Sequence, residues 1–371
     1  MQSGTMSRKT IYNHDIRHCA ESGWNGWDLY SGRAAGISRP ADLIQLHPEL
    51  KKLWPVITRH YEKIGLSHSR NPVWDVSFRV FERFPGYEIS PFIFTDAVDP
   101  KSEVARLLFE RDPVRMRIVH HINSKNNFVD LADKMGIRVP ATMSLENKKS
   151  ITSKSPGFPC FFKPAVSVSG YGIIRCENSE ELSQALRKFP NDTPCQVQEA
   201  VNADCFLNLQ YEAAEGKAWR GAATEQILDG ATHSGSRFPV PDPPWELLDP
   251  LADLLAEKGI KGVFAFDLAV AGSRLDPEYF ALECNPRFNG STYPATIAGK
   301  LGIQAWSCET FSTKYRQLHD LDFSGIEFDS STGEGIVIIN WGTVLVGKLG
   351  ILLAGTADKQ ARIRDELLIR L

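Results

Sequence analysis

Residues 281–287 read Ala-Leu-Glu-Cys-Asn-Pro-Arg, and an earlier apolar segment, residues 263–269, reads Val-Phe-Ala-Phe-Asp-Leu-Ala. Alternate side chains share one face of a β-strand. Glu283, Asn285 and, on a neighbouring antiparallel strand, Asp267 can therefore point to the same face. Carboxylate and amide oxygens are ligands that Mg²⁺ prefers. The two segments together predict a magnesium site on paired strands.

Arg287 falls on the same face if the strand continues, where its fork of N–H donors can hold a phosphoryl or acyl-phosphate oxygen. A single carboxylate in a strand is usually only a solvated position. An Asn-Pro-Arg sequence directly after an apolar strand, with Asn-Gly-Ser at 289–291, is not typical of core packing. The combination favours chemistry on a metal-bound phosphate over a purely structural role.

A second motif places a lysine before a loop of small residues. Lys163-Pro164 ends a short apolar run, and residues 167–172 follow as Ser-Val-Ser-Gly-Tyr-Gly. Such a loop lets backbone N–H groups approach phosphate oxygens while the lysine adds a positive charge; the alternative is an ordinary hairpin turn. The sequence contains neither the P-loop motif of nucleotide triphosphatases nor the G-x-G-x-x-G motif of dinucleotide-binding folds.

Composition excludes several other classes of protein. The chain has 371 residues, and 42 Lys and Arg against 45 Asp and Glu give a formal charge of −3, so no basic field indicates nucleic acid. The seven cysteines form no C-x-x-C pair, which favours reduced thiols over a disulfide framework or zinc site. The N-terminus lacks the apolar region of a secretory signal, and glycines and polar residues divide 335–355 into two short strands. We expect a cytoplasmic protein with no membrane span.

Hydrophobic periodicity and turn residues predict the secondary structure. Helices are expected at 42–64 (two pieces because of two prolines, with Asp42 as the cap), 102–110, 126–135, 179–189 (capped by Ser179) and 245–258. Strands are expected at 76–81, 161–164, 173–176, 195–201, 206–213, 218–226, 261–271 and 278–284. Residues 229–244, rich in Gly, Ser and Pro, are expected to form a mobile loop.

Taken in order, these motifs resemble the ATP-grasp superfamily over roughly residues 123–310. The resemblance implies an α/β (α+β) fold in which two lobes grip ATP after an N-terminal pre-ATP-grasp domain. The expected domains are residues 1–122 for the pre-ATP-grasp domain, 123–198 for the small lobe with the lysine and glycine loop, and 199–371 for the large lobe with the metal site.

The resemblance also implies roles for individual residues. The residues that match nucleotide-binding positions are Lys125, Lys163, Ser169, Gly170, Gln198, Glu199, Val201 and Asp204. The resemblance implies that the two lysines contact the phosphates, that Gln198 to Val201 border adenine, and that Asp204 lies near the ribose. The positions that match magnesium ligands are Asp267, Glu283 and Asn285, for one or two Mg²⁺ ions with Mn²⁺ as an alternative. Arg287 matches the catalytic arginine, Lys163 supports catalysis, and Arg237 in the 229–244 loop is the third expected catalytic residue.

The loop around Arg237 and a C-terminal pattern of strand, Leu-Val-Gly-Lys-Leu-Gly, strand and helix are similar to the peptide- and amino-acid-ligase branch, which includes pheganomycin-type peptide ligases and butirosin-type carrier-protein ligases. That similarity implies a ligase that uses ATP to join a carboxylate to an amine of an amino acid or short peptide, through an acyl phosphate. Two alternatives stay open: loading of an amino acid onto a carrier-protein thiol, and a non-catalytic ATP-binding regulator. A homodimer is compatible with either.

Overall fold

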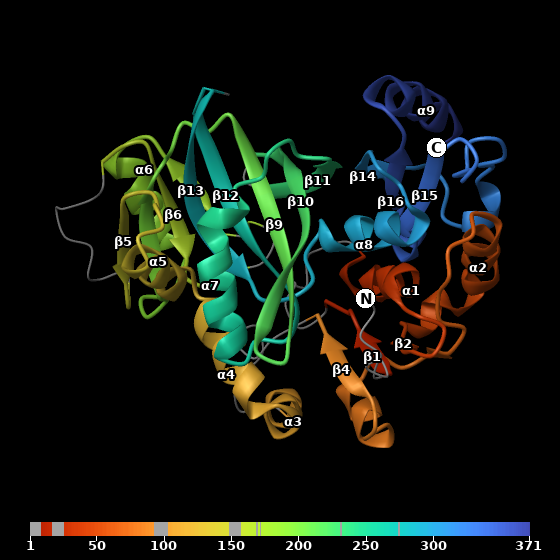
Figure 1. The fold of residues 1–371 in the computed structure, drawn as a ribbon, viewed down its shortest axis with the longest axis horizontal. Helices are drawn as coiled ribbons and strands as arrows, with labels where there is room; N and C mark the ends of the chain where they lie inside the picture. The colour runs from red at the N-terminus through yellow and green to blue at the C-terminus, as the bar shows by residue number, and fades with distance from the viewer. Residues whose placement is uncertain are drawn as a thin grey trace. The chain divides into compact units, whose positions relative to one another are not determined.

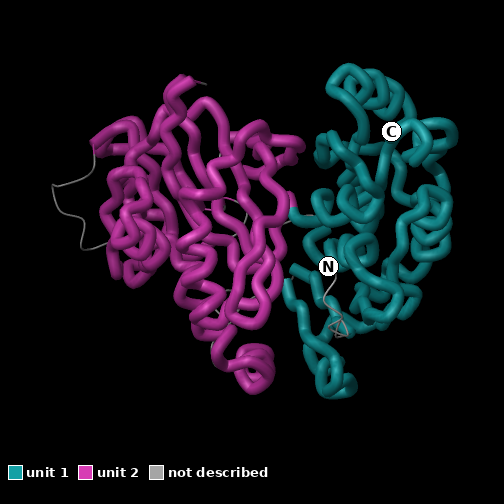
Figure 2. The backbone as a smooth tube through the Cα atoms, viewed as in Figure 1, with its two compact units in different colours: residues 1–93, 292–371 teal, residues 94–291 magenta. Residues whose placement is uncertain are grey.

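The computed structural model describes residues 9–16, 26–92, 103–147, 157–167, 170, 172–230, 232–273 and 275–371. The chain divides into two compact units (Figure 2). Unit 1 combines residues 1–93 with 292–371, and unit 2 consists of residues 94–291.

The N-terminal part of unit 1 is built on a parallel sheet in the order β3-β2-β1-β4. The strands are β1 (Thr10–Asn13), β2 (Leu43–Gln45), β3 (Pro72–Val73) and β4 (Glu88–Pro91). The helices are α1 (Ala34–Ile37), α2 (Trp54–Lys63) and three 3₁₀ helices, η1 (Trp27–Arg33), η2 (Pro48–Lys52) and η3 (Phe78–Arg83). Ile11 and Ile44 on the central strands are fully buried, so the core of this part lies against the middle of the sheet.

The C-terminal part of unit 1 contains an antiparallel group of strands in the order β14-β16-β15. Its elements are α8 (Thr292–Leu301), β14 (Trp306–Ser312), η6 (Leu318–Asp320), β15 (Gly335–Asn340), η7 (Gly342–Val346), β16 (Lys348–Ala354) and α9 (Ala357–Arg370). The two short strands predicted in 335–355 are confirmed. The Tyr61 hydroxyl on α2 donates to the carbonyl of Ile338 on β15 at 3.1 Å, which joins the two ends of the chain within one unit.

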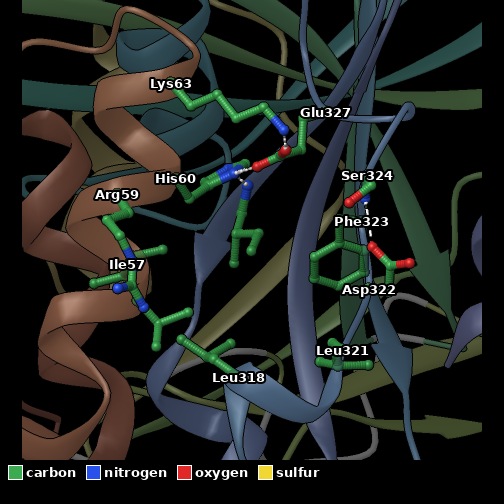
Figure 3. A pocket seen from close by; sticks show the side chains of 12 residues that line it. Ile57, Arg59, His60, Lys63, Leu318, Leu321, Asp322, Phe323, Ser324 and Glu327 are labelled. Atoms are coloured by element: carbon green, nitrogen blue, oxygen red, sulfur yellow. Dashed lines mark hydrogen bonds and ion pairs between the residues drawn. The ribbon is translucent and has the colours of Figure 1, made fainter.

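Helix α2, η6, β15 and the segment 321–327 enclose a pocket of about 220 Å³ in unit 1 (Figure 3). Half of its twelve lining residues are apolar, with Ile57, Phe323 and Ile338 among them. Its polar side includes His60 and Glu327, whose Nδ1 and Oε1 atoms lie 2.8 Å apart. None of the residues that line this pocket is a predicted site residue.

The first described part of unit 2 contains three helices and then a four-stranded antiparallel sheet in the order β5-β8-β6-β7. The elements are α3 (Glu103–Arg111), α4 (Pro113–Ile122), α5 (Lys125–Lys134), β5 (Thr142–Leu145), β6 (Cys160–Pro164), β7 (Ile174–Cys176), α6 (Ser179–Arg187) and β8 (Cys195–Glu199). Phe162, Val197 and Leu182 belong to one buried cluster between the sheet and α6. This sheet carries Lys163 and Gln198, two of the predicted nucleotide-binding residues.

The rest of unit 2 is a set of five antiparallel strands in the order β13-β12-β9-β10-β11 (Figure 1). The elements are β9 (Cys205–Ala214), β10 (Lys217–Asp229), β11 (Thr232–Phe238), α7 (Trp245–Glu257), β12 (Gly262–Ser273) and β13 (Asp276–Asn285). Helix α7 packs on β9 and β10, and α5 packs against β13. The predicted metal-binding segments are therefore neighbouring antiparallel strands, as the sequence suggested.

The two units do not coincide with the predicted domains, because residues 292–371 group with 1–93 and not with the preceding large lobe. Side-chain contacts explain the grouping: Lys300 on α8 donates to the carbonyls of Gly36 and Ser38 at 2.9 and 2.7 Å. Within unit 2, the four-stranded sheet falls in the predicted small lobe, and β9 to β13 fall in the predicted large lobe. The division into 1–122, 123–198 and 199–371 stays a prediction.

Three secondary-structure predictions were wrong. Residues 43–45 form strand β2 and not the start of a helix, because they pair with β1, and the helix α2 begins only at Trp54 with a proline in its first turn. Residues 78–83 form η3 and not a strand. Residues 232–238 form strand β11 on β10, with an irregularity in the register beside Leu228, and not an unstructured loop. Asn178, whose side chain accepts from two backbone N–H groups, caps α6 in place of Ser179.

The cysteines within the described residues are all free, and four of them are buried: Cys160, Cys176, Cys195 and Cys284. This agrees with the expectation of reduced thiols; Cys19 lies outside the described residues. Among the helices of the described residues, none has the length and the apolar character that a membrane crossing needs.

Candidate active site

A row of polar side chains crosses three adjacent strands of unit 2. Asp267 on β12 is in register with Glu283 on β13 on one side and with Asn208 on β9 on the other. The Asn208 amide donates to Asp267 Oδ1 at 2.6 Å. In-register neighbours on antiparallel strands bring their side chains close together, so the two carboxylates lie side by side as the sequence predicted.

Asn285 joins both carboxylates from the end of β13. Its Nδ2 atom donates to Asp267 Oδ2 at 3.0 Å and approaches Glu283 Oε1 at 3.4 Å. Its Oδ1 atom accepts from Arg287 Nη1 at 3.1 Å. Asn285 and Arg287 are both largely buried. The structure thus collects the four residues of the Asp267/Glu283/Asn285/Arg287 set into one continuous group.

Lys125 brings a positive charge to the same group from the N-terminus of α5. Its Nζ atom lies 2.9 Å from Glu283 Oε2 and donates to Ser167 Oγ at 3.1 Å. The backbone N–H of Lys125 donates to the carbonyl of Ala165, just after β6, at 2.7 Å. This backbone contact ties the start of α5 to the lysine loop and fixes the position of the Lys125 side chain, which is almost fully buried.

Lys163 lies on β6 and is also buried. Its Nζ atom donates to Gln198 Oε1 on β8 at 2.5 Å, and the Gln198 amide in turn donates to Thr142 Oγ1 at 2.9 Å. A polar chain therefore links three strands of the small sheet, with the Lys163 ammonium at one end. Gln198 accepts a hydrogen bond from Lys163 in this structure, and its place beside adenine stays a prediction.

The pKa values show that the site carries poorly balanced charge. Burial and the neighbouring Glu283 raise the pKa of Asp267 well above its ordinary value. Burial opposes ionisation of Glu283 as well, but the ion pair with Lys125 prevails and lowers its pKa to about 2. Burial lowers the pKa of Lys163 to about 8, since the attraction of Glu283 offsets only part of the desolvation. The adjacent carboxylates of Asp267 and Glu283 therefore have one ammonium group in close contact, that of Lys125.

The donor set fits a hard divalent cation. Asp267 and Glu283 supply carboxylate oxygens, and burial together with the neighbouring Glu283 carboxylate holds the pKa of Asp267 well above its ordinary value. The Asn285 Nδ2 group lies between the two carboxylates, where it contributes the partial positive charge that a cation would supply in full. Among the described residues, no group of three or more His, Cys, Asp or Glu side chains is arranged to hold a metal ion. Oxygen ligands of this kind suit Mg²⁺ or Mn²⁺.

The other predicted nucleotide-binding residues, at the end of β8 and just after it, lie outside this hydrogen-bonded group. Glu199 ends β8 with an exposed side chain that accepts from the Ala141 N–H at 3.3 Å. Asp204 is exposed, and its backbone N–H donates to the carbonyl of Val270 at 2.8 Å. Val201 is half-buried. Their roles, like that of the hinge as a whole, stay predictions.

The glycine loop and Arg237 have different surroundings. Ser169 lies outside the described residues, and Gly170 has a φ of 77°, a left-handed conformation that glycine adopts without strain. Arg237 lies on β11, opposite Glu225 on β10, and the two exposed side chains are 3.4 Å apart. Among the described residues, Arg237 makes no hydrogen bond to the metal set, so its catalytic role stays a prediction.

Sequence reasoning missed two amides that support the carboxylates. Asn208 is buried, and its Oδ1 accepts from Asn289 Nδ2 at 3.3 Å. A signal was present in the sequence: Asn208 and Gln210 alternate with Leu207, Leu209 and Tyr211, so one face of an otherwise apolar strand carries amides. Buried amides on a strand require partners, and here the partner of Asn208 is Asp267.

Searches against protein-family models find no match to this chain. Solved structures do match it over nearly its whole length. The N5-carboxyaminoimidazole synthetase from Staphylococcus aureus with ADP has a TM-score of 0.62 at 11% identity, covering 97% of this chain and 96% of that one. A biotin carboxylase–beta-gamma-ATP complex from Campylobacter jejuni has a TM-score of 0.60 at 12% identity, covering 100% and 92%. The chain has the ATP-grasp fold.

A third match has a second small molecule bound. The N5-carboxyaminoimidazole synthase from Aspergillus clavatus, in complex with ADP and 5-aminoimidazole ribonucleotide, has a TM-score of 0.54 at 12% identity and covers 98% of both chains. At these identities the likeness establishes the fold alone. The residues collected around Asp267 must carry any argument about activity.

Proposed function

We propose that the chain is an ATP-dependent ligase that joins a carboxylate to an amine, forms an amide or peptide bond through an acyl phosphate, and releases ADP and phosphate. The observation that supports it most directly is the single buried group in which Asp267 and Glu283 lie side by side with Lys125 and within reach of Arg287. Paired acids and several cations at one place are what the transfer of a highly charged phosphoryl group requires.

The nucleotide is ATP with magnesium. Asp267, Glu283 and Asn285 would hold Mg²⁺ or Mn²⁺, whose contribution would be to neutralise charge on the transferred phosphate. Lys125 on α5 and Lys163 on β6 would add positive charge at the phosphates. The solved structures of the same fold that contain ADP or ATP support the choice of nucleotide.

The proposed reaction has two steps. A substrate carboxylate oxygen attacks the γ-phosphorus, the bond from that phosphorus to the β-phosphate oxygen breaks, and ADP leaves. The amine nitrogen then attacks the acyl carbon, the carbon–oxygen bond to phosphate breaks, and the amine loses a proton. The protein needs no nucleophile of its own: it must orient the substrates and keep water away from the acyl phosphate. Arg287, buried at the end of β13, is the residue best placed to orient the transferring group.

The substrates we propose are amino acids or short peptides, as in the peptide- and amino-acid-ligase branch. The test is incubation of the protein with ATP, Mg²⁺ and pooled amino acids in which the carboxylates contain ¹⁸O. An acyl-phosphate route releases ADP and transfers one ¹⁸O atom to inorganic phosphate. Release of AMP and pyrophosphate would contradict the mechanism. Transfer to a carrier-protein thiol would give the same ADP and labelled phosphate only when the carrier is supplied.

A further inference from the structure

A chain of hydrogen bonds runs from strand β11 to the candidate metal site. Ser236 Oγ on β11 lies 2.6 Å from Ser291 Oγ, and the backbone N–H of Ser291 donates to Asn289 Oδ1 at 2.9 Å. Asn289 Nδ2 donates to Asn208 Oδ1 at 3.3 Å, and Asn208 Nδ2 donates to Asp267 Oδ1 at 2.6 Å. All of these residues belong to unit 2.

The chain is buried along its length. Ser236, Ser291, Asn208 and Asn289 are between 1% and 8% exposed. Hydrogen bonds that are shielded from water hold their geometry well, and a buried polar group that loses its partner is costly. If Ser236 loses its hydroxyl, the buried groups between it and Asp267 have no water to replace the lost hydrogen bond. The change should therefore disturb the position of the Asp267 carboxylate.

His233 closes the outer end of the chain. Its Nε2 atom lies 3.1 Å from Ser236 Oγ. Its ring packs on Gly290, where a Cβ atom would come within 2.5 Å of the ring carbon Cε1. Burial lowers the pKa of His233 to about 4, so the ring is neutral near pH 7. The neutral ring does not take up a proton near pH 7, and its Nε2 atom is a hydrogen-bond partner for the Ser236 hydroxyl.

We propose that Ser236 is a positioning residue for the candidate metal site, and that it fixes the Asp267 carboxylate through Ser291, Asn289 and Asn208. The inference rests on the proposed function, in which Asp267 binds the divalent cation. In this proposal strand β11 has a specific structural role. The strand aligns residues 289–291, which directly follow the Asn-Pro-Arg motif, with the amide that orients Asp267.

The test measures binding of Mn²⁺ by the loss of the free-ion electron paramagnetic resonance signal, in the presence of ADP. We expect Ser236→Ala to weaken Mn²⁺ binding about fivefold to tenfold. This is below the roughly 10- to 100-fold loss typical of residues that hydrogen-bond a metal ligand directly, because Ser236 acts on Asp267 through three other residues. Ser236→Thr, which keeps the hydroxyl, should stay within about twofold of the unmodified protein. Ser234→Ala is the matched control, because the Ser234 hydroxyl lies on the same strand but donates to the carbonyl of Ile227 at 3.0 Å.

Equal Mn²⁺ affinity in Ser236→Ala and the unmodified protein would overturn the proposal, and so would equal losses in Ser236→Ala and Ser234→Ala. Absence of Mn²⁺ binding in the unmodified protein would instead contradict the proposed function. A second measurement separates the two: hydrogen exchange of the Asn208 side-chain amide by NMR. We expect slow exchange in the unmodified protein and in Ser234→Ala, and faster exchange in Ser236→Ala. Unchanged exchange in Ser236→Ala would overturn the positioning role whatever the metal result.

Discussion

Two clusters of charged side chains, one in each unit, differ in how completely they are neutralised. In unit 1, Glu327 accepts from His60 Nδ1 through one oxygen and pairs with Lys63 through the other, while His60 Nε2 accepts from the Ile338 N–H at 3.2 Å (Figure 3). In unit 2, Asp267 and Glu283 lie side by side, and Lys125 makes an ion pair with Glu283.

The pKa values express the same contrast. Burial opposes ionisation of Glu327, yet the hydrogen bonds from His60 and Lys63 lower its pKa below the usual value. The pKa of Asp267 is raised well above its usual value because burial and Glu283 act in the same direction. A cluster whose charges are neutralised within the protein indicates a structural role. A cluster of adjacent buried carboxylates is the arrangement that a cation would bind, and the contrast supports the proposal that the unit 2 cluster is functional.

The sharpest way to break this comparison is Glu283→Gln. The change removes one of the two paired carboxylates, and we expect ADP release to fall at least about 100-fold, more than the loss caused by residues that only orient a ligand. The fold should persist, because Gln is nearly isosteric. Glu212→Gln, an exposed glutamate on β9 in the same sheet, is the control and should retain full activity. Undiminished ADP release from Glu283→Gln would remove the metal assignment.

A smaller effect is expected from Lys163→Ala. Charge-assisted hydrogen bonds are each worth about 1.5–3 kcal/mol, so the ATP dissociation constant measured by calorimetry should rise roughly 10- to 150-fold. Lys188, an exposed lysine at the end of α6, gives a matched control in Lys188→Ala. If Lys163 serves only to hold Gln198, stability should drop while ATP affinity stays the same, and the phosphate role would be wrong.

The sequence predicted the two strands that carry the candidate metal set because the information is local. Asp267, Glu283 and Asn285 lie in apolar strands whose period of two places polar side chains on one face, and the structure confirms both strands and their pairing. The fold class is also confirmed. The support for Asp267 was missed because Asn208 and Asn289 reach it through strand order and a turn, and neither can be read from spacing along the chain.

The wrong predictions share a physical cause, which is tertiary context. Residues 43–45 are helical by periodicity alone, but they pair with β1 in a parallel sheet. Residues 232–238 are polar and contain glycine, yet they have an available edge on β10 and form β11. The predicted domain boundaries stay a prediction. The grouping of residues 292–371 with the N-terminal segment was not foreseen because it depends on contacts such as Tyr61 to Ile338, which join residues far apart in sequence.

Changes in the unit 1 cluster of His60, Lys63 and Glu327 should alter the free energy of unfolding. Glu327→Ala leaves His60 without its acceptor, which we expect to cost about 1–3 kcal/mol, and Glu327→Gln should cost less because an acceptor remains. The folded-state pKa of Glu327 is lowered, so its contribution is fully present above the unfolded value of 4.5 and is lost as pH falls through the folded value. Urea unfolding at pH 7 and pH 3 checks both points. A difference between Glu327→Gln and the unmodified protein that is the same at the two pH values would contradict the pairing.

The smallest effect should come from Arg237→Ala. This change decides whether Arg237 on β11 has a structural or a catalytic role. The Arg237 and Glu225 side chains are 58% and 38% exposed, and exposed ion pairs contribute about 0.2–1 kcal/mol. If the pair is only structural, Arg237→Ala and Glu225→Ala should change stability by this small amount, and kcat and KM should match those of the unmodified protein. If Arg237 is catalytic, as the sequence predicted, kcat should fall in Arg237→Ala and not in Glu225→Ala. Steady-state kinetics of the two variants beside their urea unfolding curves separates these outcomes, because a role in the reaction changes kcat without a matching loss of stability.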